Sequence, residues 1–589
     1  MAWLRRLTRR SSMVQSFLTR SFELLLILFF LVVIQLPIPG EGGGPIVPMA
    51  SHLHWMILSI IILLGVLQVA WRGVLLISSF LKYVFLFIFS ILLAAWFQPP
   101  VSMHAFVFQT AGLVGGLLFL VALHQFPLDE QPRKRLLAVI LIAGVMQAAM
   151  ALTQLQTEDE AGISGALVNK NILATFLATG LIIALLFLLR HSLGRGTIVL
   201  LFLAVALSLT TLILASSRAG LVGLVLGCTT LIIARWQAFH QVWKRVLAVW
   251  GMALVVALLA VSLSGQQKRV EEMTGKMADL PTFVAESVGG RDGNQYKVGR
   301  PLHFEAAWSL FLERPLWGQG VGGYSSRYRD LVRTRYPEVN LNTNDHAYQP
   351  YNELLRRLAE SGIGAGVGLL LMAGWMLALL YRQGREEGGT LLALMMPIAF
   401  DLQVEGLFYD TVALWATLLV LVSLATAYKL TRVNLLHHGL RAGLATLGLG
   451  LFVGVSMFLF NTARAQWDMT RYLYLLRTTR VSRGELLQPA LDNLYLRQMA
   501  TRLFMDVRLR IALLRQDREV IGQFLQWSRK ERALWPNHVM YLNESRALHA
   551  HGDHEAARSL LMEGLRLFPG QHELSLLQKE LFSQSMIDY

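Results

Sequence analysis

The sequence has few charged residues and almost no cysteine. Of its 589 residues one is cysteine, and only 15% are Asp, Glu, Lys or Arg, whereas a soluble domain carries about 25% charged residues. A single cysteine excludes a disulfide framework and a cysteine-based metal site. Cys228 lies in an apolar run, where a thiol stays protonated and makes a poor nucleophile. The low charge excludes a chain made only of soluble domains.

Apolar residues are abundant instead, at 54% of the chain with a mean hydropathy of +0.49. A membrane-spanning helix needs about 20 mostly apolar residues. Thirteen runs meet this need, at 22–38, 54–70, 78–97, 103–124, 136–154, 168–190, 196–216, 219–235, 245–264, 362–381, 389–407, 410–428 and 440–461. The first lacks a small-residue cleavage site at its exit and is interpreted as an anchored helix. The sequence therefore predicts an all-α, polytopic membrane protein of about 13 transmembrane helices.

Lys and Arg concentrate in the turns that follow the even-numbered runs. These turns contain Arg72, 133–135, Arg190 with Arg195, 235–245, Arg382 with Arg385, and 429–441. The turns of the other side, at 39–53, 98–102, 155–167 and 408–409, have no Lys or Arg. The positive-inside rule then predicts a cytoplasmic N-terminus and an outer C-terminus. The net charge of +15 is largely a topology signal, and we expect no nucleic-acid partner.

Two long segments lie outside the apolar runs, both on the predicted outer side. The sequence thus divides into nine spans at 1–264, an outer loop at 265–361, four spans at 362–461 and an outer tail at 462–589. In the tail, the motif 533–537 recurs 33 residues later, and a turn at 551–553 separates two helical patterns. This resembles a tetratricopeptide helix-turn-helix unit, with 505–533, turning at Gln516-Asp517, as a divergent preceding unit. We expect such a domain to contact a neighbour or a protein partner.

Several cations break the inner-face pattern, among them Arg291 and Lys297 of the outer loop, and three of them are singled out. Lys170 begins the sixth run, Arg218 follows two serines in a short turn, and Arg300 lies in the outer loop. A cation at the outer edge of a span needs a partner. One interpretation is a pocket for a phosphate or diphosphate group. The alternative is that each side chain extends to lipid headgroups.

The outer loop also contains His346, followed closely by Tyr351, Asn352 and Glu353. A histidine above the bilayer can accept a hydroxyl proton at neutral pH, oriented by Asp345 or Glu353. The alternative is a solvated loop histidine, and spacing alone leaves both open.

Two further patterns have competing interpretations. Residues 318–323 contain a GxGxxG string, but no strand pattern precedes it, so a dinucleotide site is rejected. Asp401 and Glu405 share a helix face in the eleventh run, which suits ion coupling in a transporter. Glu405 lies near the outer end, where it could instead line an outer pocket.

Four stretches resemble the O-antigen ligase superfamily, which includes O-antigen polymerases and bacterial protein O-oligosaccharyltransferases. They are an Asn-x-Asn entry to a span (169–171), a Ser-Arg turn (216–220), an Arg-containing loop helix ending in Pro-Leu-x-Gly-x-Gly (299–320), and a loop exit (351–362). The resemblance covers roughly residues 20–430, and the tail resembles extensions that some members carry. Many members have His-Asn where this chain has Tyr351-Asn352. Either His346 supplies the base from a longer turn, or this branch uses another base.

The resemblance implies a GT-C-like membrane glycosyltransferase with undecaprenyl diphosphate as the glycan carrier. It implies no cofactor and no metal site, and a place in the bacterial inner membrane with the reaction at the periplasmic face. Arg218 and Arg300 would stabilise the leaving diphosphate together with Lys170, and His346 would be the base. The remaining substrate contacts are expected from Asn169, Asn171, Tyr351, Asn352, Glu353 and Glu405.

The acceptor separates three functions within the superfamily. Lipid A-core defines a ligase, the growing glycan a polymerase, and a protein hydroxyl an oligosaccharyltransferase; we expect the ligase. A lipid-linked glycan transporter predicts internal repeats and several deep charges, of which Asp401 is the main example. A membrane scaffold that displays the tail predicts no effect of the loop residues on glycan attachment.

Overall fold

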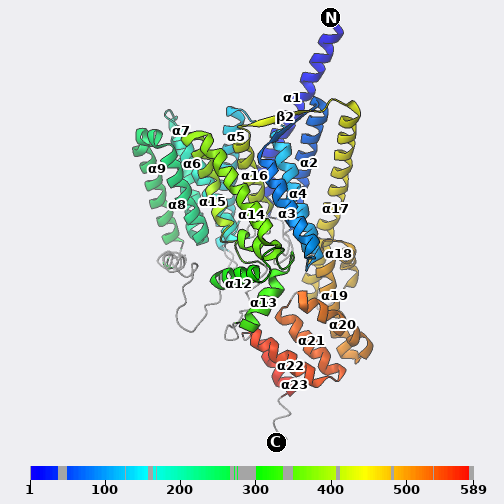
Figure 1. Cartoon of the computed structure of the whole chain (residues 1–589). Helices are drawn as coiled ribbons and strands as arrows, with labels where there is room; N and C mark the ends of the chain where they lie inside the picture. The colour runs from blue at the N-terminus through cyan, green and yellow to red at the C-terminus, as the bar shows by residue number, and fades with distance from the viewer. Residues whose placement is uncertain are drawn as a thin grey trace. The chain divides into compact units, whose positions relative to one another are not determined.

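The fold is almost entirely α-helical (Figure 1). A computed structural model describes residues 2–37, 49–126, 128–156, 163–167, 169–264, 271, 275, 300–335, 349–405, 411–478, 483–534, 536–568 and 570–582. The all-α class and the polytopic membrane architecture are confirmed, since the long apolar runs form helices and only two short strands occur in these ranges.

Each of the thirteen apolar runs falls on a helix. These helices are α1 (Ala2–Leu31), α2 (Met49–Arg72), α3 (Phe80–Phe97), α4 (Met103–His124), α5 (Glu130–Thr153), α6 (Lys170–Leu188), α7 (Arg195–Ala215), α8 (Arg218–Ala234), α9 (Trp236–Leu263), α14 (Glu353–Arg382), α15 (Gly384–Asp401), α16 (Val412–Thr426) and α17 (His438–Thr478). Within the described ranges, ten are long and apolar enough to cross a membrane, and α8 and α16 are shorter apolar helices. The remaining helix, α15, ends at Asp401 and so covers only 389–401 of the run 389–407.

The chain forms two compact units, and the first comprises 1–87, 111–280 and 368–463. Its centre is α6, most of which is buried by α5, α7, α8 and α15. Helices α6 and α8 run in parallel at very short range: a Cβ added to Gly220 would lie 2.5 Å from the Cβ of Ala174, and Gly227 contacts Ile182 further along. Small residues permit this approach where lipid gives helices little hydrophobic drive to associate.

A two-stranded antiparallel sheet, which was not predicted, joins two turns of this unit. Strand β1 (Val74–Ser78) pairs with β2 (Leu430–Asn434), with Val74 opposite Asn434. Arg441 donates to the carbonyl oxygens of Ala70 and Trp71 beside the sheet. Short 3₁₀ turns at Val33–Gln35 and Gln154–Gln156 follow α1 and α5. The sheet connects segments that the positive-inside pattern places on the same side of the membrane.

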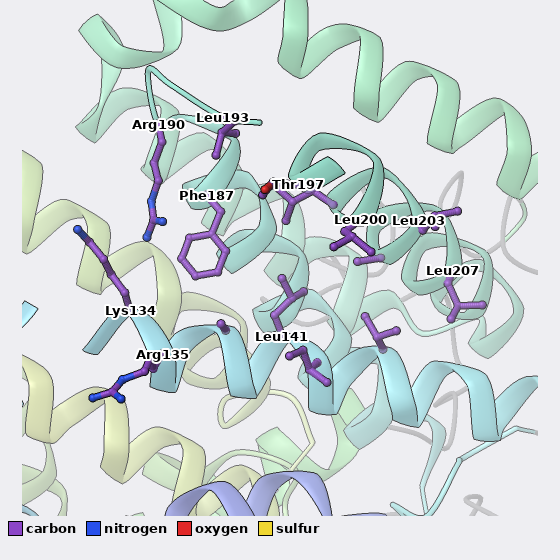
Figure 2. A pocket seen from close by; sticks show the side chains of 15 residues that line it. Lys134, Arg135, Leu141, Phe187, Arg190, Leu193, Thr197, Leu200, Leu203 and Leu207 are labelled. Atoms are coloured by element: carbon purple, nitrogen blue, oxygen red, sulfur yellow. The ribbon is translucent and has the colours of Figure 1, made fainter. Parts of the chain in front are cut away.

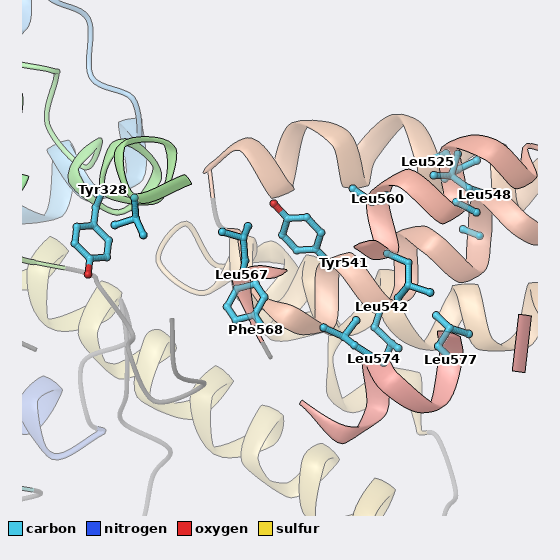
Figure 3. Close-up of a cluster of buried hydrophobic side chains, with 14 of the residues drawn as sticks. Tyr328, Leu525, Tyr541, Leu542, Leu548, Leu560, Leu567, Phe568, Leu574 and Leu577 are labelled. Atoms are coloured by element: carbon cyan, nitrogen blue, oxygen red, sulfur yellow. The ribbon is translucent and has the colours of Figure 1, made fainter. Parts of the chain in front are cut away.

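The second unit comprises 88–110, 281–367 and 464–589. Its remaining elements are α12 (Arg300–Glu313), α13 (Tyr324–Arg335), a 3₁₀ turn (Gly484–Leu486), α18 (Gln488–Asp492), α19 (Arg497–Arg515), α20 (Arg518–Leu534), α21 (His538–His551), α22 (His554–Leu567) and α23 (His572–Phe582). One buried hydrophobic cluster contains residues of the loop helices α12 and α13 and of α19 to α23. Figure 3 shows Tyr541, Leu567 and Phe568 in this cluster. The outer loop and the tail therefore share a core.

Within the tail, α19 with α20 and α21 with α22 form two helical hairpins. The predicted turns are confirmed: Gln516 and Gly552 adopt left-handed conformations, and Asp553 caps α22 by accepting from the amide of Ala556. Tyr541 of α21 contacts Gly564 of α22. The assignment of these hairpins to the tetratricopeptide class stays a prediction, as do the four domain boundaries. Helices α3, α4, α14 and α17 each contribute residues to both units.

Asp506 provides a test of the tail's packing. Burial raises the pKa of its carboxyl to about 6, although Asn543 donates a hydrogen bond to it. Because the folded pKa exceeds the unfolded value, stability is lost as the pH rises from about 4 through 6, by up to about 3 kcal/mol. Asp506→Asn should therefore raise the melting temperature at pH 7.5 and not at pH 4. The control is Asp517→Asn at an exposed helix cap, which should leave the melting temperature unchanged at both pH values. An equal effect of Asp506→Asn at both pH values would contradict this account.

Candidate functional site

The first group of predicted site residues lies at the start of α6. The side chain of Asn169 caps this helix by accepting from the amide of Asn171 at 2.8 Å, and Lys170 is the first helical residue. Lys170 is exposed, and the two asparagines are half-buried. The Asn-x-Asn pattern thus has a local structural use, because the cap satisfies an amide that the helix itself leaves without a partner.

Arg218 occupies the equivalent position on α8. Ser216 turns the chain with a φ of 53°, and Ser217 caps α8 by accepting from the amide of Gly220 at 3.4 Å. Arg218 is then the first residue of the helix. Since α6 and α8 are parallel and touch at Gly220 and Ala174, the first turns that carry Lys170 and Arg218 adjoin one another.

The end of α15 completes this group. Asp401 is fully buried and accepts a hydrogen bond from Thr175 of α6 at 2.9 Å. Glu405 follows one turn later, where its amide donates to the carbonyl of Asp401 at 2.8 Å. We call Asn169, Lys170, Asn171, Arg218 and Glu405 the α6–α8 end. It combines two helix N-termini, whose partial charges are positive, and two cations with one carboxylate, that of Glu405. The excess of positive charge suits a multiply charged anion.

A second group lies on the loop helices. Arg300 is the first residue of α12, and its guanidinium carbon lies 5.7 Å from the centre of the Tyr351 ring. Tyr351 has a φ of 54°, which is unusual for a residue with a side chain. Asn352 caps α14 by accepting from the amide of Leu355 at 2.8 Å. The structure therefore brings Arg300 and Tyr351 together beside the Asn352 cap, and their role in substrate binding stays a prediction.

His303, which the sequence reasoning missed, lies at the centre of this second group. It is 1% exposed, stacks on Tyr328 with ring centres 4.4 Å apart, and meets Tyr351 edge-on at 5.2 Å. The sequence does contain a pattern that points to His303: it follows Arg300 by three residues, so in a helix the two side chains share one face.

His303 is hydrogen-bonded to Tyr324 through both its ring and its backbone. The Tyr324 hydroxyl donates to the backbone carbonyl of His303 at 3.1 Å. The oxygen of that hydroxyl also lies 3.1 Å from Nδ1 of the His303 ring. Because a hydroxyl has one proton, Nδ1 donates in this arrangement and Nε2 keeps its lone pair. Burial and the nearby Arg300 lower the pKa of His303 to about 4, so the ring is neutral at pH 7.

Glu353 belongs to a buried ion cluster at the start of α14. Its carboxylate accepts two hydrogen bonds from Arg356, at 3.0 and 3.1 Å, and one from Arg357 at 2.7 Å. Arg356 also contacts Glu360 at 3.3 Å and Gln109 at 3.2 Å. The structure thus places Glu353 among arginines, and its role as a substrate contact stays a prediction.

The glycine string 318–323 wraps around the same part of α14. Gln319 and Gly320 donate to the carbonyls of Ala359 and Glu360, and the amide of Gly322 donates to the Glu360 carboxylate at 3.0 Å. Gly362 has a φ of 74° and kinks α14 where Ile363 donates to Pro315. A Cβ on Gly318 would lie 2.5 Å from the Glu360 backbone. These glycines allow close backbone contact, which agrees with rejecting a dinucleotide site.

His346 lies outside the described residues, so its role as base stays a prediction. The same holds for Asp345, its proposed orienting partner. Among the described residues the two groups of site residues are each assembled within one unit, the α6–α8 end in the first and the Arg300 group in the second.

Comparison with known families defines the class. Residues 203–373 match the model of the O-antigen ligase family, and residues 390–580 match that of the virulence factor membrane-bound polymerase, C-terminal. The protein is thus a membrane enzyme of the ligase or polymerase type. More particularly, the two matches support the O-antigen ligase superfamily. No curated protein matches it. Arg218, Arg300 and Tyr351 fall within the first match and Glu405 within the second, whereas 169–171 precede both.

The ion cluster predicts a large cost for removing one partner. Arg356→Met would leave Glu353 and Glu360 buried with fewer counter-charges, which costs about 3–5 kcal/mol. We expect a markedly lower melting temperature in detergent. Glu130→Gln removes one partner of an exposed pair with Lys134 and should leave the melting temperature nearly unchanged. Equal melting temperatures for Arg356→Met and the unmodified protein would contradict a stabilising role of the ion cluster.

His303 predicts a pH dependence. As the pH falls from 6.5 to about 4, the unfolded chain binds a proton at this ring that the folded protein does not, so stability is lost by about 3 kcal/mol. His303→Phe keeps a stacking ring but cannot bind the proton, so its acid destabilisation should be smaller by that amount. Denaturation at pH 7 and pH 4 measures it, with the exposed His572→Phe as control. The prediction fails if both variants respond to acid like the unmodified protein.

Proposed function

We propose that the protein transfers a glycan from undecaprenyl diphosphate to the hydroxyl of an acceptor, as an O-antigen ligase does with lipid A-core. The observation that carries the proposal is the α6–α8 end. Lys170 and Arg218 begin two adjoining parallel helices, so two cations and two positive helix termini belong to the same end of the pair. A diphosphate, with several negative oxygens, is the group that such an end binds best.

The reaction follows from charge development at the diphosphate. The acceptor oxygen attacks the anomeric carbon as the bond from that carbon to the diphosphate oxygen breaks, which inverts the configuration. The diphosphate gains negative charge as it leaves on its lipid, and fixed cations stabilise that charge. The acceptor's proton passes to a base. Arg300 as a further cation and His346 as the base keep the roles predicted from the sequence, and we expect neither a metal nor another cofactor.

Several contacts support the proposed topology, with a cytoplasmic N-terminus in the bacterial inner membrane and a periplasmic tail. Glu387 forms ion pairs with Arg133 at 3.0 Å and Arg235 at 3.3 Å. Strands β1 and β2 pair directly. Each contact joins turns that the positive-inside pattern assigns to the cytoplasm. The α6–α8 end lies at the opposite ends of these helices, which favours a reaction at the periplasmic face.

Two observations favour other acceptors of the same superfamily. The match of residues 390–580 to a polymerase model supports the growing glycan as acceptor. The helical tail, whose core includes the loop helices, supports docking of a protein acceptor or an assembly partner. A lipid-linked glycan transporter is less well supported, since both family matches are to ligases and polymerases.

Substitution at the α6–α8 end tests the donor site. We expect Arg218→Ala to lower the rate of glycan release from purified undecaprenyl-diphosphate-linked glycan by about 10²–10³, the usual effect of losing one donor to a developing oxyanion. Lys170→Ala should lower it further. Arg382→Gln, at the exposed end of α14, is the matched control. Release at the unmodified rate by the Arg218→Ala, Lys170→Ala double variant would exclude the proposed site.

Deletion of the gene identifies the acceptor. Loss of long lipopolysaccharide with accumulation of lipid-linked glycan is the result expected for a ligase. Shortened glycan chains that remain attached would identify a polymerase, and altered mobility of individual proteins an oligosaccharyltransferase. Unchanged glycans on all three acceptors would contradict the transferase proposal.

A further inference from the structure

A groove on the first unit lies between α5 and α7, far along these helices from the proposed donor site. It has a volume of about 630 Å³, within the usual range for ligand sites. Figure 2 shows the basic side chains of Lys134, Arg135 and Arg190 toward one end and Leu200, Leu203 and Leu207 extending away from them. The groove thus has one cationic end and a long apolar part.

We propose that this groove binds an acidic glycerophospholipid, with its phosphate at Lys134, Arg135 and Arg190 and an acyl chain along the leucines. The three cations belong to turns that the positive-inside pattern assigns to the cytoplasmic leaflet. Basic pockets between membrane helices on that side suit anionic headgroups, with each cation near the surface contributing to binding. This inference does not depend on the proposed glycosyl transfer.

The length of the groove favours an acyl chain of one leaflet. On α5 the lining runs from Lys134 to Val145, which at 1.5 Å per residue spans roughly 16 Å. Half of the hydrocarbon core is about 15 Å. A free phosphate would leave the apolar part empty, and an undecaprenyl chain is far longer than one leaflet. The groove therefore matches a phospholipid better than either.

The side chains of the groove are accessible from the bilayer. Leu200 is 68% exposed, Leu203 55% and Ile142 47%. Such exposure is ordinary for a surface in contact with lipid, but the cations above it make the site selective by charge. Arg190 lies over the ring of Phe187 at 4.5 Å, which orients its guanidinium. Lys134 pairs with the exposed Glu130 one turn away, and Arg135 pairs with Glu23 at 3.3 Å. Ion pairs at the surface are weak, so a phosphate can replace both carboxylates.

The test uses the full-length protein in neutral detergent, with phosphatidylglycerol and phosphatidylcholine of identical acyl chains. We expect phosphatidylglycerol to raise the melting temperature by a few degrees and phosphatidylcholine not to do so. The triple variant Lys134→Gln, Arg135→Gln, Arg190→Gln should bind phosphatidylglycerol roughly a hundredfold more weakly. The control is a second triple variant that removes three exposed cations predicted on the same side of the membrane, Arg382→Gln, Lys429→Gln and Arg432→Gln. It should bind phosphatidylglycerol like the unmodified protein.

A second variant separates the acyl chain from the headgroup. Leu200→Trp fills the apolar part at an exposed position and should weaken phosphatidylglycerol binding while the cations remain. Equal binding by both triple variants would overturn the site. Normal binding by Leu200→Trp, or full competition by inorganic phosphate, would show that only the phosphate is held. Stronger binding of undecaprenyl phosphate than of phosphatidylglycerol would assign the groove to the glycan carrier instead.

Discussion

The close parallel packing of α6 and α8 is the constraint on which the candidate donor site depends. In a bilayer, helices gain little from hydrophobic burial against one another, so they associate through close van der Waals contact. Gly220 permits that contact with Ala174, and α7, which links the two helices, returns the chain to the side from which α6 began. Two helix N-termini then lie together without any β-structure to align them. The candidate site thus depends on glycine at position 220, where any side chain would clash with Ala174.

The main constraint in the second unit is a buried ion cluster at the start of α14. Two glutamates and two arginines occupy consecutive turns of α14, and the Gly322 amide of the glycine-rich loop donates to the Glu360 carboxylate. Removing the charges from water is costly, and only dense hydrogen bonding offsets this cost. The arrangement fixes the loop against the kink at Gly362. Tyr351, next to this helix start, is thereby held where it can support Arg300.

The features that the sequence predicted are those with a simple local cause. Apolar length predicted the spans, and the turns of the tail followed from Gly552, Asp553 and the polar pair at 516–517. Lys170 and Arg218 were recognised because each lies on the predicted outer side, whereas most Lys and Arg of the short turns lie on the side predicted to be cytoplasmic. His303 was missed although it shares a helix face with Arg300, because its burial depends on Tyr324 and other residues of later segments. Arg356 was missed although Glu353 and Glu360 lie within about one turn of it, because helix spacing alone does not show that the group is buried. The β1–β2 pair was missed because a five-residue strand has no signal without its partner.

That strand pair has a consequence for how the protein is made. Val74 and Asn434 lie about 360 residues apart, so β1 leaves the ribosome long before β2 exists. At about 5–20 residues per second, this interval is roughly 20 to 70 seconds. During it, a hydrogen-bonding edge of five residues stays exposed at the membrane surface while ten further apolar helices are inserted. The two strands can pair only after this interval, which gives an insertion factor or chaperone time to engage the unpaired β1.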